Sequence, residues 1–284
     1  MKKLFAMLIV CAIMLSGVAM AEATEIPRGE IVELVSGKTY SIDGETFRVK
    51  YAFNLPEDSE QSVIIKVGNA PEVTCTGWYL EGKVYAAFLD TYDFCILVGD
   101  YGPSDDHWSE IFYYDSYEET LTDIGGVGAL PKNITINNDG TFSCMVRANV
   151  LYTWFRPADF TIAQAHLFDE EYNYIPTSPK VVELPRAQYP MGAVAYPTMD
   201  IPVCTDTDFD EVAFVVPAGD EMFFTVTDDR TWVMVTHYTL NEYDYPEQEM
   251  GYIQIDPEGY WTDVILNGKS YSGYEIFRGL LYAD

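Results

Sequence analysis

Short apolar or alternating runs, separated by Gly, Pro, Asn and Asp, recur along the chain after its first 21 residues. Alternation with a period of two is typical of half-buried β-strands, and helical periodicity is nearly absent. We expect strands at 63–67, 73–80, 84–89, 94–98, 111–114, 134–136 and 141–146, and a further strand in the alternating segment 159–171. This rhythm predicts an all-β protein whose N-terminal part is an antiparallel meander, propeller-like or a sandwich.

Two dipeptides between these runs have turn chemistry. Glu81-Gly82 and Asp139-Gly140 each place a glycine after an acidic residue. Gly adopts left-handed backbone without steric cost, so both dipeptides are predicted to close antiparallel hairpins.

Prolines mark the expected boundary between two parts of the chain. Five of them lie between residues 176 and 197, where they alternate with short apolar pieces. Because Pro lacks a backbone donor and favours extended structure, the stretch is predicted to be an edge strand or linker. The expected organisation is an N-terminal all-β domain at 26–186, a small barrel at 190–257 and a C-terminal β extension at 258–284.

The first 21 residues have the three parts of a secretory signal peptide. Lys2 and Lys3 form a basic start, an apolar run follows, and Ala19-Met20-Ala21 is a small-x-small cleavage pattern. The alternative, a membrane anchor, is disfavoured because the uninterrupted apolar part is shorter than a span of about 20 residues. We therefore expect a mature protein that is secreted or associated with the cell envelope and has no membrane span.

Charge narrows the possible partners. The whole chain has a formal net charge of −29, and loss of the two signal-peptide lysines makes it −31. Such a surface repels phosphate backbones and anionic lipid, which argues against nucleic-acid partners.

Four cysteines remain after the signal peptide: Cys75, Cys95, Cys144 and Cys204. They are widely spaced, and three of them lie inside apolar runs, where a free Cys behaves as a small hydrophobe. We expect buried free thiols with at most one disulfide. No C-x-x-C motif supports zinc binding or thioredoxin-type chemistry.

The C-terminal part resembles a bacterial SH3-like (SH3b-type) domain. The matching features are Ile201-Pro202-Val203, the segment 215–220 before a strand at 222–226, Trp232 at the start of the next strand, and Gly251-Tyr252-Ile253. The resemblance implies a small barrel with a tight turn at Gly219, a core anchored by Trp232 and a last strand that begins at Gly251. Residues 236–250 replace a short turn of the family, in a position to cover or reshape a groove.

A fainter resemblance links the N-terminal part to propeller-type β repeats with acidic calcium loops. The strand 94–98 ends in Gly99-Asp100, as in those repeats, but the regular Asp-x-Asp-x-Asp-Gly spacing is missing, so no ligands are carried over. From its residues alone, this loop offers a candidate Ca²⁺ site at Asp100, Asp105 and Asp106, since Ca²⁺ takes six to eight oxygen ligands. The alternative is a solvated turn, and otherwise no cofactor is expected.

Aromatic residues suggest a binding surface. Aromatic rings stack on sugar faces and on Pro-rich peptides, although Tyr and Trp also serve ordinary strand packing. The candidate ligand-binding residues are Trp108, Tyr113, Tyr114, Trp232, Tyr243, Tyr245 and Tyr252.

Catalytic motifs are absent: the chain has three His, no Gly-x-Ser-x-Gly and no zinc-peptidase motif. We therefore predict no catalytic residues and an exported binding protein, which contacts a cell-wall polymer, an extracellular glycan or a protein partner. The alternative is an extracellular polysaccharide hydrolase that uses a pair among its 45 acidic residues. Such an enzyme needs a deep cleft with paired carboxyl groups, one of which has a raised pKa.

Overall fold

A computed structural model describes residues 23–89, 94–103, 106–137, 139–148, 150–163, 167–168, 174–175, 178–260 and 262–282. The prediction of an all-β protein is confirmed. In the described part, the strands are accompanied by the 3₁₀ turn η2 (Pro131–Asn133) and the single-turn helix α2 (Gly273–Ile276). Within these residues, no helix has the length and apolarity needed to cross a membrane. The predicted signal peptide, residues 1–21, lies outside the described residues.

The N-terminal part contains two five-stranded sheets. The first has the order β1-β3-β4-β5-β6 and the second the order β10-β9-β8-β7-β2. The first consists of β1 (Thr24–Glu25), β3 (Thr39–Ile42), β4 (Glu45–Asn54), β5 (Gln61–Val67) and β6 (Val73–Gly77). The second consists of β2 (Ile31–Glu33), β7 (Leu80–Phe88), β8 (Phe94–Asp100), β9 (Trp108–Asp115) and β10 (Thr120–Val127).

A third sheet covers the second one, with the order β11-β12-β13-β16. Its strands are β11 (Thr135–Ile136), β12 (Phe142–Ala148), β13 (Trp154–Ala163) and β16 (Lys180–Leu184), and β14 (Leu167–Phe168) pairs separately with β15 (Tyr174–Ile175). The strand expected at 159–171 is thus realised through Ala163 and again at Leu167–Phe168, and its other residues lie outside the described part.

The second sheet is buried on both faces, which explains its continuous apolar runs. In β8, Ile96 and Val98 face a core shared with the first sheet, whereas Cys95 and Leu97 face a core shared with the third. Strands buried on both faces show unbroken hydrophobicity instead of alternation. The N-terminal part is therefore a three-layered β structure.

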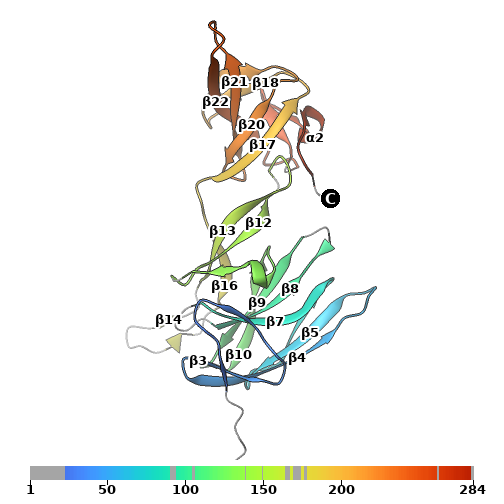
Figure 1. The fold of residues 1–284 in the computed structure, drawn as a ribbon, viewed down its shortest axis with the longest axis vertical. Helices are drawn as coiled ribbons and strands as arrows, with labels where there is room; N and C mark the ends of the chain where they lie inside the picture. Colours follow the sequence, from blue (N-terminus) through green and yellow to red (C-terminus); the bar gives the residue numbers. More distant parts are fainter. Residues whose placement is uncertain are drawn as a thin grey trace, which may run out of the picture.

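The C-terminal part is one curled sheet with the order β19-β18-β22-β21-β20-β17-β25, extended by β23 and β24 (Figure 1). Its strands are β17 (Tyr189–Pro197), β18 (Ile201–Cys204), β19 (Val212–Val216), β20 (Met222–Thr227), β21 (Trp232–Leu240), β22 (Pro246–Ile255), β23 (Val264–Leu266), β24 (Lys269–Tyr271) and β25 (Phe277–Arg278).

The β12–β13 ribbon joins the two parts, and in Figure 1 it lies between the layered part and the curled sheet. The end of the ribbon, including Leu151 and Trp154, is buried in the same core as the C-terminal strands, and the Thr153 N–H donates to the Leu281 carbonyl at 3.0 Å. Val264 and Phe277 also belong to this core. Strands β23, β24 and β25 pair within the curled sheet, so the described residues 262–282 pack together with the strands of the expected barrel.

The prediction for Glu81-Gly82 was wrong. Strands β6 and β7 belong to different sheets, so no hairpin joins them. Gly82, at φ +76°, lies instead in a β-bulge of β7 between Leu80 and Val84. The hairpin at Asp139-Gly140 is confirmed, since β11 and β12 pair antiparallel around it.

Three expectations attached to the SH3-like resemblance change in detail. Trp232 does not anchor the core: Val233 and Val235 point inward, so Trp232 lies on the outer face and is half-buried.

Gly251 lies within β22, where an added Cβ would approach the Cys204 carbonyl to 2.4 Å. Residues 236–250 form a two-stranded hairpin that extends β21 and β22 and do not lie across a groove. The turn at Gly219, with φ +91°, is as predicted.

The four cysteines are free, and three of them are buried, as expected. Burial raises the pKa of Cys75 and of Cys144 to about 12, so both thiols are protonated at neutral pH.

Candidate functional site

Asp100 holds the corner where the chain passes from the first sheet to the second. Its carboxylate accepts the backbone N–H groups of Trp78 and Tyr79, both at 3.0 Å, and of Gly102 at 2.8 Å. A Cβ on Gly77 would lie 2.2 Å from this carboxylate, so the close approach requires glycine there. Hydrogen bonds from backbone amides to an ionised carboxylate are among the stronger ones in proteins.

Four large aromatic side chains are exposed around this corner. Tyr101 donates its N–H to the Tyr79 carbonyl at 3.0 Å, and Trp108 is the strand partner of Asp100 on β9. The exposed fractions are 60% for Trp78, 52% for Tyr79, 40% for Tyr101 and 43% for Trp108. We call these four residues the aromatic end. Exposed aromatic groups gathered in one place are typical of binding surfaces.

Trp108 is fixed in orientation. Its Nε1–H donates to Glu110 at 2.6 Å, and the indole lies against Gly126, where a Cβ would come within 2.7 Å of the ring. Burial raises the pKa of Glu110; the indole donor opposes the shift, and a hydrogen bond and the charge of Asp123 add to it. The Trp108 ring is therefore fixed at its Nε1 edge by Glu110 and by the close backbone of Gly126.

A cleft of about 440 Å³ adjoins Trp108. It lies where the end of β10 meets β12, β13 and β16, and its lining includes Gly126–Gly128, Arg147, Phe155 and Glu183. Phe155 is 53% exposed and is the strand partner of Arg147, which forms an ion pair with Asp106. The volume falls within the range of small-ligand sites, about 300–1,000 Å³.

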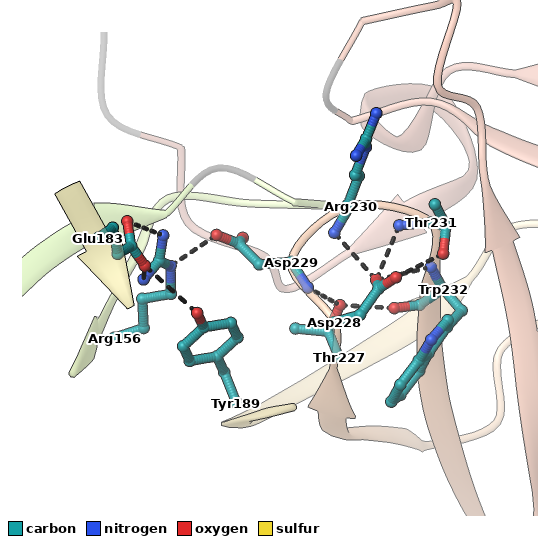
Figure 2. A network of polar contacts seen from close by, with 9 residues as sticks. All are labelled: Arg156, Glu183, Tyr189, Thr227, Asp228, Asp229, Arg230, Thr231 and Trp232. Carbon is teal, nitrogen blue, oxygen red and sulfur yellow. Dashed lines mark hydrogen bonds and ion pairs between the residues drawn. The ribbon is translucent and has the colours of Figure 1, made fainter. Parts of the chain in front are cut away.

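Arg156 is among the residues that line the cleft. Figure 2 shows its polar contacts. Its guanidinium binds both oxygens of Glu183, at 2.5 and 3.2 Å, and its Nε donates to Asp229 at 2.6 Å. It also stacks over the Tyr189 ring, 4.4 Å from the centroid. Burial raises the pKa of Asp229 even though Arg156 acts in the opposite direction. The network joins β13 and β16 to the β20–β21 loop.

The loop that carries Asp229 is ordered by its neighbour Asp228. One oxygen of Asp228 accepts the N–H groups of Arg230, Thr231 and Trp232 at 3.0, 2.7 and 3.1 Å, as Figure 2 shows. Carboxylate capping of successive N–H groups fixes such a turn. Asp229 is thereby presented to Arg156.

The structure separates the predicted ligand-binding residues. Tyr113 is buried between the second and third sheets, and Tyr114 packs on the opposite face. Trp232 and Tyr252 form an edge-to-face pair with ring centroids 5.4 Å apart on the outer C-terminal face. Tyr243 and Tyr245 are 71% and 69% exposed on the β21–β22 hairpin. Trp108 alone of the seven belongs to the aromatic end.

The acidic loop does not gather into a cation site in the described residues. Asp100 is occupied by three amide donors and Asp106 by Arg147, while Asp105 lies outside the described residues. Across the described part of the chain, no group of three or more His, Cys, Asp or Glu residues is placed to hold a metal.

Trp78, Tyr79, Tyr101, Phe155 and the arginines of the cleft were missed from the sequence. Trp78 and Tyr79 lie near the end of the strand expected at 73–80, and nothing local shows that the chain changes sheets there. Charge offered one signal: Arg147 and Arg156 are two of only 14 basic residues after residue 21, and they lie on the two strands of one hairpin.

Comparison with protein-family models, with curated proteins and with solved structures finds no match to this chain. Its function is therefore argued from the geometry of the site.

Proposed function

We propose that this chain is an exported, non-catalytic binding protein, and that the aromatic end and the adjoining cleft hold an extracellular glycan such as a cell-wall polymer. The observation that carries the proposal is the group of four exposed aromatic side chains fixed around Asp100. The C-terminal half, with its resemblance to SH3-like modules, supplies a second contact surface in this proposal.

The chemistry of the site suits a neutral glycan. Sugar rings present C–H faces that stack on aromatic rings, and hydroxyl groups that bond to charged side chains. Arg147 and Arg156 lie in the cleft beside acidic partners, so donors and acceptors are held in place before a ligand arrives. A preorganised site loses little side-chain entropy on binding.

Retention on glycans tests the proposal. The purified mature chain is applied to insoluble wall fractions and to gels containing soluble neutral polysaccharides. Retention is expected, and Trp78→Ala and Trp108→Ala should each weaken it by about three- to tenfold, the worth of one stacking contact. Tyr117→Ala is the matched control, because Tyr117 is 76% exposed in the β9–β10 turn, away from Asp100. The proposal fails if no glycan retains the chain, or if all three variants behave alike.

A polysaccharide hydrolase is the second candidate, favoured by the raised pKa of Glu110 beside the exposed Trp108. Glycosidase carboxyl groups stand about 5–10 Å apart with the scissile bond between them, whereas Glu110 hydrogen-bonds directly to Asp123. Release of reducing ends from a retained polysaccharide, abolished by Glu110→Gln, would favour the enzyme over the binding protein.

A further inference from the structure

The turn at the tip of the β21–β22 hairpin is held by side-chain and backbone hydrogen bonds. The Asn241 side-chain oxygen accepts the N–H groups of Tyr243 and Tyr245 at 2.9 and 3.1 Å, and the Asn241 N–H donates to the Tyr245 carbonyl at 2.9 Å. Asp244 adopts a left-handed backbone at φ +60°. These hydrogen bonds fix the backbone of both tyrosines, whose side chains are exposed at the tip.

The base of the hairpin is also fixed. His237 is 4% exposed, stacks on Phe214 with centroids 6.2 Å apart, and has Glu249 3.3 Å from one ring nitrogen and Asp220 3.6 Å from the other. The hairpin is thus attached to the rest of the curled sheet through the packed imidazole of His237 and the two carboxylates beside it.

One face of the hairpin carries exposed apolar side chains, and the other carries glutamates. The register pairs Tyr238 with Gln248 and Leu240 with Pro246, so these four side chains share a face. Tyr238 and Leu240 are 54% and 68% exposed. Glu247 and Glu249 alternate onto the opposite face, and Glu242 and Asp244 flank the tip. No Lys or Arg occurs between residues 231 and 268.

From this arrangement we propose that the β21–β22 hairpin is a protein-docking element whose tyrosine tip inserts into an apolar groove with a basic rim on an extracellular partner protein. Tyr is enriched at the centres of protein interfaces, and complementary charge guides association. A second copy of this chain is disfavoured because its own acidic tip would face the first, and anionic lipid is repelled in the same way. The proposal does not depend on glycan binding at the aromatic end.

Selection from a random peptide library displayed on phage, with the full mature chain as bait, tests the proposal. Peptides enriched on the wild-type chain are expected to carry net positive charge and at least one large apolar residue. The affinity of a selected peptide, measured by fluorescence anisotropy, should fall by about tenfold or more in the Tyr243→Ser/Tyr245→Ser double variant. It should also fall as salt increases.

The control is Tyr117→Ser, which removes an equally exposed tyrosine from the N-terminal part and should leave the affinity unchanged. Since Tyr243 and Tyr245 are solvent-exposed, the double variant should unfold at the wild-type temperature. The proposal is overturned if no peptide depends on the two tyrosines, or if the dependent peptides are neutral or acidic.

Discussion

Single residues set the geometry of the aromatic end. Asp100 collects three backbone donors, and Gly77 and Gly126 leave room for groups that any side chain would displace. From the sequence, the carboxylate of Asp100 was a candidate Ca²⁺ ligand, with a solvated turn as the alternative, and in the structure it accepts backbone N–H groups instead. The difference arises because the Trp78 and Tyr79 amides come from a segment 21 and 22 residues earlier in the chain.

Gly126→Ala is expected to displace Trp108. The new Cβ would lie 2.1 Å from the Ser109 carbonyl and 2.7 Å from the indole, so the backbone or the ring must move. We expect a loss of stability of about 1–3 kcal/mol, as for other overpacked sites, together with weaker glycan retention. Urea unfolding measures the first effect. Gly128→Ala is the control for stability, since its Cβ has ordinary contacts at 3.8 Å; an equal loss of stability in both variants would contradict the argument.

Glu110→Gln should change the pH dependence of stability. The pKa of Glu110 in the folded state is raised above 4.5, mainly by burial. As pH rises from 4.5 through the raised value, the unfolded chain releases this proton first, so this group makes the folded state less stable. A glutamine can still accept from Trp108 and cannot ionise.

The Glu110→Gln variant is therefore expected to match the wild type at pH 4 and to exceed it at pH 7 by up to about 1 kcal/mol, after allowance for partial exposure. Urea unfolding at the two pH values measures the difference. A gain of the same size at both pH values would show that the effect does not come from ionisation.

At the scale of elements, the local sequence pattern predicts where strands lie, but it does not predict which strands pair with one another. The run 94–98 was recognisable as a buried strand, and Asp139-Gly140 as a hairpin turn. Glu81-Gly82 has the same chemistry yet forms a bulge, because Trp78 and Tyr79 turn the chain into another sheet. The SH3-like resemblance implies that Trp232 anchors the core, but Val233 and Val235 point inward. Neighbouring residues of a strand point to opposite faces, so Trp232 lies on the outer face. The cleft could not be predicted, since β10, β12, β13 and β16 meet only through tertiary packing.

Arg156 on β13 supports a prediction about the network that joins β13 and β16 to the β20–β21 loop. Arg156→Met keeps the aliphatic packing but leaves Glu183 and the largely buried Asp229 without their cation. We expect a loss of about 2–3 kcal/mol in the free energy of unfolding. Asp229→Asn in the same chain should recover part of it, because the uncompensated carboxylate is gone.

Arg186→Met is the matched control, because the Arg186–Asp159 pair is more exposed and should contribute less than about 1 kcal/mol. Urea unfolding of the variants provides the comparison. If Arg156→Met lowers the free energy of unfolding no more than Arg186→Met does, the packing between the two parts does not depend on this network.

At the scale of the whole molecule, two candidate surfaces lie on different parts of one acidic chain. The three-layered part carries the aromatic end and the cleft, and the curled C-terminal sheet carries the tyrosine-tipped hairpin. The β12–β13 ribbon and Arg156 connect these parts. A protein with this arrangement is suited to hold a glycan with one part and a basic protein partner with the other, which is our proposal for its role outside the cell.

Fluorine NMR of the chain from residue 22 onward, labelled with 5-fluorotryptophan, tests the central claim most directly. The chain has five Trp residues, and single Trp→Phe variants assign their signals. On titration with a glycan that retains the protein, we predict saturable shifts of the Trp78 and Trp108 signals and none for the buried Trp154 or for Trp232 on the C-terminal face. Saturable shifts at Trp232 with Trp78 and Trp108 unchanged would contradict the assignment of the glycan site to the aromatic end.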